Sequence, residues 1–289
     1  MDSSFTNTNV VTKFVVSNCQ KKKSATSLIH KNANIEDSIF ALTEPWTGSS
    51  NRCTFQSPWR VMTKENNSRA ALISPPWADA FMHTKQSDRD SVFCTLNIGG
   101  EEVIVGVMYV ENGLIDVNKW SNRFNELQAI CPKILVFADS NAHSTLWGYK
   151  KSDIKGRKWE EFLGLTNLEV FTNSYAVTFK NSRDFSSCID IAFGTSNLKT
   201  LLSDRIMSLF PSASDHLTWG INFNVPLETN AETFWRLKSV DWEKFNAALL
   251  VKLGSCPGRD LLVELDVADQ IDALTSFFQA TMEEIIDKL

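Results

Sequence analysis

The stretch that decides the fold is Ile134-Leu135-Val136-Phe137-Ala138-Asp139-Ser140-Asn141-Ala142-His143-Ser144. It opens as a continuous apolar run, which is typical of a strand buried on both faces of a sheet. It then turns polar and presents an acid, an amide and an imidazole at Asp139, Asn141 and His143. A buried strand that ends in such groups usually delivers them to a site at a sheet edge. The simpler interpretation is a strand followed by a polar turn.

Two further strand-like segments carry an isolated acid and favour a site. Residues 39–44 form an apolar run that ends on Glu44, directly before Pro45. Asp190 lies inside the run of residues 187–193, although strand interiors disfavour Asp and a buried carboxylate needs a partner or a metal. An isolated acid at or near a buried strand therefore occurs at widely separated places in the chain.

A third segment places Asp215 and His216 next to each other, just before a final strand that begins near Trp219. Together with Glu44, Asp139 and Asp190, this gives several oxygen ligands at or near buried strands. Such a set suits a hard divalent cation such as Mg²⁺, which prefers carboxylates, water and phosphate oxygens.

These motifs occur in a characteristic order: Asn18, Glu44-Pro45-Trp46, Tyr109, Asp139-x-Asn141-Ala142-His143, Ile189-Asp190 and Ser214-Asp215-His216. In this order the chain resembles the endonuclease/exonuclease/phosphatase superfamily. Within it, the chain resembles the apurinic-type endonuclease domain of non-LTR retrotransposons of the jockey and R1 kind. The family usually reads Gly-Asp-Phe-Asn where this chain reads Ala138-Asp139-Ser140-Asn141, so the acid and the amide are kept and an aromatic residue is lost.

The resemblance implies a metal site. Glu44 would be the main ligand of Mg²⁺, or of Mn²⁺, with Asn18 beside it and Asp215 near the metal. The simpler interpretations are a turn residue for Glu44 and a helix N-cap for Asn18.

The resemblance also implies a catalytic set. Asp139 would orient or deprotonate the attacking water, and Asn141 would hold the scissile phosphate. Tyr109 would contact the phosphate or the leaving oxygen. Asp190 would fix the tautomer of His216, which would stabilise the transition state. His143 is interpreted as a structural residue of the loop.

The remaining pattern predicts mixed sheets with helices outside. The clearest hairpin joins residues 91–98 to residues 101–110 through Gly99-Gly100, a pair suited to a tight turn. Helices are expected over residues 117–130 and 156–165, where apolar residues share one face. With the resemblance, the fold class is α+β: a four-layer α/β sandwich of two packed mixed β-sheets flanked by helices, DNase I-like.

The chain has 289 residues, of which 43% are hydrophobic, so one large domain with an appendage is expected. We expect a disordered N-terminus over residues 1–12, the endonuclease/exonuclease/phosphatase domain over 13–225, and a helical linker over 226–289. The linker resembles the segment that leads to a reverse transcriptase in such elements, which would make this chain part of a polyprotein that lacks that domain.

Composition limits the compartment and the partners. No run is long enough to span a bilayer, no secretory signal is seen, and the six cysteines show no metal-binding spacing, so an intracellular protein with free thiols is expected. It would be nuclear when acting on chromosomal DNA. With a net charge of −5, the protein is not expected to bind DNA mainly through its overall charge. Basic residues follow both Asn18 and the central motif and are interpreted as phosphate contacts or as solvated surface: Lys21, Lys22, Lys23, Lys150, Lys151, Lys155, Arg157 and Lys158.

Three functions stay open from the sequence. The first is a Mg²⁺-dependent endonuclease that nicks target DNA. The second is a catalytically inactive remnant of a retroelement that serves as a nucleic-acid-binding or interaction module. The third and most distant is a phosphatase acting on lipids or inositol phosphates, against which the Ala142-His143-Ser144 context and the following Trp147-Gly148 speak. The sequence leaves the oligomeric state open.

Overall fold

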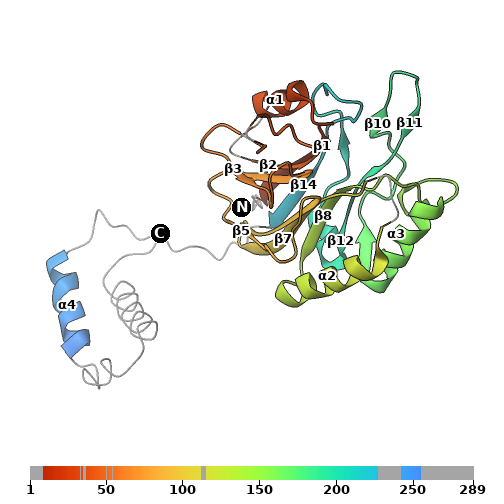
Figure 1. Ribbon diagram of the computed structural model, residues 1–289. Coiled ribbons are helices and arrows are strands. Elements are labelled where there is room, and N and C mark those ends of the chain that lie inside the picture. Colours follow the sequence, from red (N-terminus) through yellow and green to blue (C-terminus); the bar gives the residue numbers. More distant parts are fainter. Residues whose placement is uncertain are drawn as a thin grey trace, which may run out of the picture. The chain divides into compact units, whose positions relative to one another are not determined.

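The computed structural model describes residues 9–32, 34, 37–49, 51–53, 55–111, 115–226 and 242–254. The chain divides into two compact units, residues 1–227 and 228–289. The first unit contains two six-stranded sheets and their helices (Figure 1).

The first sheet has the strand order β13-β14-β1-β2-β4-β3. Its members are β13 (Ile206–Met207), β14 (Trp219–Pro226), β1 (Asn9–Asn18), β2 (Ser38–Thr43), β4 (Ala70–Ser74) and β3 (Arg60–Met62). Strands β1 and β2 run parallel, with Asn18 opposite Thr43. Because Glu44 follows Thr43 directly, Asn18 and Glu44 come to the same edge of this sheet.

The second sheet has the order β5-β6-β7-β8-β12-β9. Its members are β5 (Ala80–Met82), β6 (Ser91–Ile98), β7 (Glu101–Tyr109), β8 (Ile134–Asp139), β12 (Asp190–Thr195) and β9 (Leu168–Val170). Tyr109 lies opposite Asp139 in the parallel pair of β7 and β8, and Asp190 lies opposite Asp139 in the antiparallel pair of β8 and β12. Asp190 therefore begins its strand, whereas the sequence predicted a position inside one.

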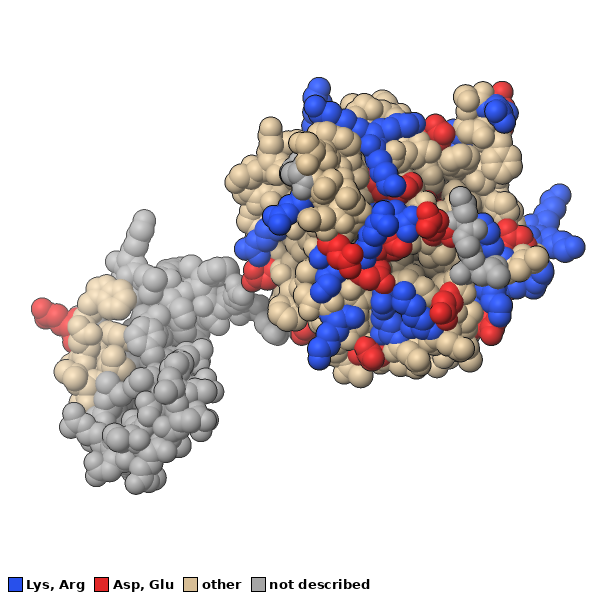
Figure 2. All heavy atoms as spheres, viewed as in Figure 1, with Lys and Arg blue, Asp and Glu red and all other residues tan. Residues whose placement is uncertain are grey.

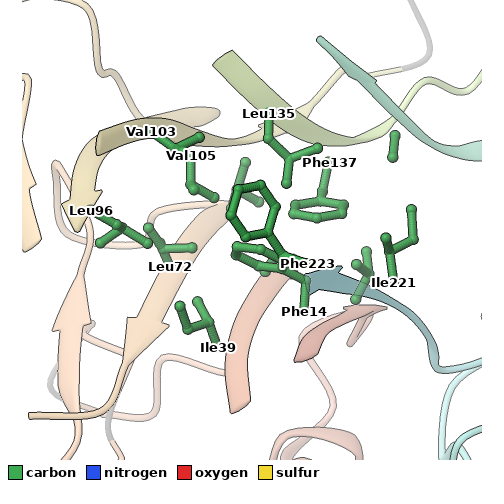
Figure 3. Close-up of a cluster of buried hydrophobic side chains, with 14 of the residues drawn as sticks. Phe14, Ile39, Leu72, Leu96, Val103, Val105, Leu135, Phe137, Ile221 and Phe223 are labelled. Atoms are coloured by element: carbon green, nitrogen blue, oxygen red, sulfur yellow. The ribbon is translucent and has the colours of Figure 1, made fainter. Parts of the chain in front are cut away.

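The main core lies between the two sheets and consists of the side chains that point inward from both (Figure 3). It includes Phe14, Ile39, Leu72, Ile221 and Phe223 from the first sheet and Leu96, Val103, Val105, Leu135 and Phe137 from the second. A second core packs α2 (Val117–Ile130) and α3 (Ile154–Leu165) on the outer face of the second sheet, and a third packs α1 (Lys23–Lys31) on the first sheet. The layers are thus helix, sheet, sheet and helices, which confirms the predicted four-layer architecture.

Local sequence explains where these elements begin and turn. The side chain of Asp116 accepts a hydrogen bond from Lys119 N at the start of α2, and Asp153 does the same for Gly156 N at the start of α3. The second cap makes α3 begin two residues earlier than predicted. Gly99 and Gly100 have φ of 62° and 86° in the β6–β7 hairpin, which residues with a Cβ rarely adopt. The predicted hairpin is therefore confirmed with its turn chemistry.

Three short elements complete the described part of the first unit. They are the 3-10 helices η1 (Thr145–Trp147) and η2 (Ser196–Leu201) and the two-stranded hairpin of β10 (Phe179–Lys180) and β11 (Ser186–Ser187). Figure 1 shows this hairpin extending beyond the two large sheets.

The two ends of the chain were predicted less well. Strand β1 begins at Asn9, and Thr12 pairs with Phe223 of β14, so the prediction of disorder up to residue 12 is wrong for residues 9–12. Residues 1–8 lie outside the described part. In the second unit, α4 (Trp242–Gly254) is described, and the rest of the expected linker lies outside the described residues.

Two expectations from composition can be compared with the described residues. Among these residues no helix has the length and apolar character that crossing a membrane requires. The five described cysteines are buried free thiols: Cys19, Cys53, Cys94, Cys131 and Cys188.

Candidate active site

The polar strand ends of the two sheets meet in one cavity of about 310 Å³. Six of the predicted residues line it: Asn18, Glu44, Tyr109, Asp139, Asn141 and His216. Asp190 lies directly behind His216, with its Oδ2 2.9 Å from Nδ1 of the imidazole. A larger cavity of about 370 Å³, lined by residues of β5, β6 and β7, contains none of these groups, so we place the site in the smaller one.

Asn18 joins the acids of the two sheets. Its amide nitrogen donates to Oδ2 of Asp139 at 2.7 Å and to Oε2 of Glu44 at 3.3 Å. Its amide oxygen accepts from the backbone N–H of Gln20 at 2.7 Å. Asn18 thus presents a donor rather than an oxygen ligand to the cavity, which does not match the metal-ligand role predicted for it. The N-cap interpretation is wrong, because Lys22 is the N-cap of α1.

Asp190 and His216 form a buried acid–imidazole pair. The side chains are 3% and 5% exposed, and Nε2 of His216 lies 4.0 Å from Oδ2 of Asp139. Burial disfavours the charged imidazolium, but the carboxylate of Asp190, supported by Asp139 and Glu44, outweighs that effect and raises the pKa of His216 to about 9. The imidazole is therefore held in its charged form and directed at the cavity.

The surroundings of Asp139 favour the neutral form of its carboxyl. Burial, reinforced by the negative charge of Asp190, raises the pKa of its carboxyl to about 7, although His216, Asn18 and the backbone N–H of Asn141 favour the carboxylate. Oδ1 of Asp139 accepts from that N–H at 3.2 Å. The local chain makes this contact possible because Asn141 adopts φ of 46°. The side chain of Asn141 is fixed in turn by donation to the carbonyl of Val110 at 2.9 Å.

Glu44 and Tyr109 approach the cavity from opposite sheets. Glu44 adopts φ of 46°, its backbone N–H donates to the carbonyl of Arg69 at 2.8 Å, and its Oε1 lies 3.8 Å from Nζ of Lys21. Burial, with the nearby carboxylates of Glu44 and Asp139, raises the pKa of Tyr109 well above its usual range. Tyr109 therefore presents a neutral hydroxyl, which can donate a hydrogen bond.

Asp215, like Asp190, is a predicted site residue that does not line the cavity. Its carboxylate is 41% exposed and lies 3.7 Å from Nζ of Lys22. Its backbone N–H donates to Oε1 of Gln20 at 3.0 Å. The structure therefore brings Asp215 near the site through its main chain and turns its carboxylate toward a lysine.

Several residues that line the cavity were not predicted. They are Gln20, Phe179, Phe185, Ser187 and Ile189. His143, which was interpreted as structural, also lines the cavity, with Nδ1 3.3 Å from Asp153. Phe179 packs its ring against that of His216, with the ring centroids 5.0 Å apart. An aromatic residue stands on each side of the short polar stretch 180–184. This pattern could have indicated that the segment lines the cavity.

The donors in the cavity suit a hard cation. One oxygen of Glu44 and one of Asp139 contact the same amide nitrogen of Asn18. Asp139, Asp190 and His216 also offer ligand atoms within 4.8 Å of one another, but Nδ1 of His216 already pairs with Asp190. Oxygen donors of this kind fit Mg²⁺ or Mn²⁺ better than a soft metal.

Part of the chain is similar to known proteins. Residues 103–219 match a family model described as endonuclease-reverse transcriptase. No curated protein matches the chain. The endonuclease domain of TRAS1, a telomere-specific non-LTR retrotransposon, superposes with a TM-score of 0.64 at 22% identity, covering 75% of this chain and all of that one.

Two other solved structures share the fold. The AP endonuclease LMAP from Leishmania major has a TM-score of 0.60 at 11% identity, over 75% of this chain and 88% of that one. The 3′-5′ exonuclease NExo from Neisseria meningitidis has a TM-score of 0.51 at 14% identity, over 73% of this chain and 99% of that one.

The fold is thus that of the DNase I-like nucleases. The match over residues 103–219 shows that this part of the chain is similar to the endonuclease-reverse transcriptase family.

Proposed function

We propose that this chain is a Mg²⁺-dependent DNA endonuclease that nicks target DNA as the endonuclease part of a non-LTR retrotransposon protein. The observation that carries the proposal is the meeting of two strand-end sets in one cavity. Glu44 and Asn18 come from the first sheet, and Tyr109, Asp139 and Asp190 come from the second. An acid pair, a charged imidazole and neutral hydrogen-bond donors together suit the hydrolysis of a phosphodiester.

Each residue has a role that fits its surroundings. Asp139, with a pKa near neutrality, accepts the proton of the attacking water. His216, held charged by Asp190, stabilises the negative charge that develops on the phosphate. Asn141 and Tyr109 hold the phosphate oxygens and the leaving oxygen.

Glu44 would hold the divalent cation, with Asp139 on the other side of Asn18. When bound, the cation offsets negative charge on the phosphate and lowers the cost of expelling the leaving oxygen. Asn18 would keep the two acids at a fixed separation. Lys21, which lies beside Glu44, would be free to turn toward a phosphate once the cation is bound.

The expected partners are DNA and a reverse transcriptase domain. The description of the matching family joins an endonuclease to a reverse transcriptase, and we propose the same association for this chain, with a nuclear site of action on chromosomal DNA. Figure 2 shows Lys and Arg interleaved with Asp and Glu on the face seen there, rather than a continuous basic surface. DNA contact would then be local, through side chains such as the exposed Lys150 and Lys151.

The inactive-module alternative is not favoured, because no acid of the catalytic set is replaced and the Asp190–His216 pair is formed. The deciding experiment incubates the chain with supercoiled plasmid in Mg²⁺, in Mn²⁺ and in EDTA. We expect relaxed circles with either metal and none in EDTA. The nicks should be closed by DNA ligase, or extended by a polymerase, if they carry a 3′-hydroxyl. Plasmid that stays supercoiled in both metals while the protein binds duplex DNA would favour the inactive module.

A further inference from the structure

Arg69 lies at the point where the two sheets meet beside the cavity. It directly precedes β4 of the first sheet, and its side chain is 8% exposed. Its guanidinium grips Asp90, which precedes β6 of the second sheet, through Nε at 2.5 Å and Nη2 at 2.6 Å. Its Nη1 lies 2.7 Å from Glu111, just past β7. Such a two-pronged pair has a fixed geometry that a lysine cannot reproduce.

The same guanidinium covers the ring of Tyr109. Its central carbon lies 4.8 Å from the ring centroid, which is within cation–π distance. The backbone of Tyr109 is held by the same assembly, because its N–H donates to the carbonyl of Asp90 at 2.8 Å. The ring of Tyr109 is thereby fixed on one face by a cation that cannot move without breaking its pairs with Asp90 and Glu111.

The main chain of Arg69 holds Glu44, the acid that comes from the first sheet. Its carbonyl accepts the backbone N–H of Glu44 at 2.8 Å, and Glu44 needs that restraint because its φ of 46° is unfavourable for a residue with a Cβ. One residue thus contacts both the acid from the first sheet and the phenol from the second. Neither contact requires Arg69 itself to reach the cavity, and it is absent from the lining residues.

We propose that Arg69 is a positioning residue that locks the ring of Tyr109 against the cavity, so that the phenol hydroxyl meets the scissile phosphate in a single orientation. The proposal rests on the endonuclease function proposed above. It differs from a merely structural role because its effect on catalysis passes through Tyr109. Loss of the guanidinium would leave DNA binding in place and slow the chemical step, since misplacing a contact group by about 1 Å can cost about a hundredfold.

The test compares Arg69→Met with Arg89→Met in plasmid nicking. Arg89 is a matched control, because it is exposed, its Nε donates to the carbonyl of Asn67 at 3.3 Å and it carries the same charge in the same region. We expect kcat of Arg69→Met to fall roughly ten- to a hundredfold with KM changed less than about twofold. Arg69→Lys should behave like Arg69→Met. It keeps the charge, so it also serves if the methionine variant does not fold.

A double-mutant cycle with Tyr109→Phe separates positioning from general structure. If Arg69 acts through the phenol, Arg69→Met should cause no further loss in the Tyr109→Phe background. Losses that multiply, or an Arg69→Met variant that nicks as fast as Arg89→Met, would overturn the proposal.

A readout that needs no activity covers the case in which the wild type does not nick DNA. The sequence has three tyrosines, so fluorotyrosine labelling gives three fluorine resonances, and Tyr109→Phe identifies the one of interest. Arg69→Met and Arg69→Lys should move that resonance toward the position of the exposed Tyr175, while Arg89→Met leaves it in place. An unmoved resonance would refute the role of Arg69 whatever the fate of the endonuclease proposal.

Discussion

The side-chain amide of Asn18 donates a hydrogen bond of 2.7 Å to the carboxylate of Asp139, and the two residues end strands of different sheets. The same nitrogen lies 3.3 Å from Glu44. One neutral donor therefore holds two acids that would otherwise repel each other in a buried place. The two halves of the site depend on this contact for their spacing.

Replacing that donor by an acid should make the fold depend on metal. Asn18→Asp would place a third carboxylate beside Glu44 and Asp139, and loss of a hydrogen bond to a charged partner costs about 2 kcal/mol. We expect the melting temperature in EDTA to fall and Mg²⁺ to raise it by more than in the wild type. Asn66→Asp, an equal charge change on an exposed loop residue, is the control. A variant as stable in EDTA as this control would show that the amide does not hold the two acids.

Glu44 should carry the response to metal. For the wild type, Mg²⁺ at about 100 times its dissociation constant should add about 2.7 kcal/mol to the free energy of unfolding. Glu44→Gln has nearly the same shape, so it should fold in EDTA and lose most of that gain. Asp215→Asn tests the predicted metal role of Asp215, whose carboxylate faces Lys22. We expect this variant to keep the gain in unfolding free energy. Calorimetric titration with Mg²⁺ would contradict this if Asp215→Asn weakened binding of the metal more than Glu44→Gln does.

Much of the candidate site could be predicted because strands buried on both faces have a continuous apolar pattern. Apolar runs that stop at Asp139 and Glu44 marked two strand ends, and the parallel pairing of β1 with β2 and of β7 with β8 brought those ends to sheet edges. The β6–β7 hairpin was equally clear, since Gly99 and Gly100 fit a turn that needs positive φ. The apolar runs and the glycine turn depend only on neighbours in the sequence, whereas the strand pairing joins distant segments.

Other features depend on contacts that no local pattern records. Asp215 and His216 are adjacent, yet the structure turns the imidazole into the cavity and the carboxylate of Asp215 toward Lys22. The sequence shows the pair but not which member turns inward. Arg69 finds its partners at Asp90 and Glu111, far along the chain, so its burial could not be read from spacing.

Stability in the absence of metal should fall as pH rises, because two groups at the site bind protons more tightly in the folded state. The folded-state pKa of His216, about 9, lies above its ordinary value of 6.5, so its contribution is fully present below pH 6.5 and is lost by about pH 9. The raised pKa of Asp139 acts in the same direction between about pH 4 and 7.

Urea unfolding in EDTA at a series of pH values would measure this. The difference in unfolding free energy between wild type and His216→Gln should shrink from pH 6.5 to 9. His83 provides a contrast, because burial lowers its pKa and places its effect below pH 6.5. His83→Gln should therefore differ from the wild type by a constant amount over the same range. A His216→Gln difference that stays constant as well would mean that the imidazole is not charged in the fold.

The Asp190–His216 pair should act as one unit in catalysis. His216→Ala removes the cation, and Asp190→Asn removes both the charge that sustains it and the acceptor that orients it, at 2.9 Å from Nδ1. Each change should lower nicking by about a hundredfold or more, as for other donors to a developing anion. Once the imidazolium is absent, Asp190 has nothing left to support, so the double variant should be little slower than His216→Ala alone.

DNA affinity distinguishes this from a loss of structure. Lys150 and Lys151 lie on the surface after the central motif, away from the buried pair, so binding of duplex DNA should survive in both single variants and in the double variant. Lys150→Ala with Lys151→Ala should do the reverse: it should weaken binding, reduce its salt dependence and leave kcat unchanged. If Asp190→Asn and His216→Ala each kept near-full nicking, the pair would serve only to join β12 to the segment before β14. The transition-state charge would then have to be met by Asn141 and Tyr109 alone.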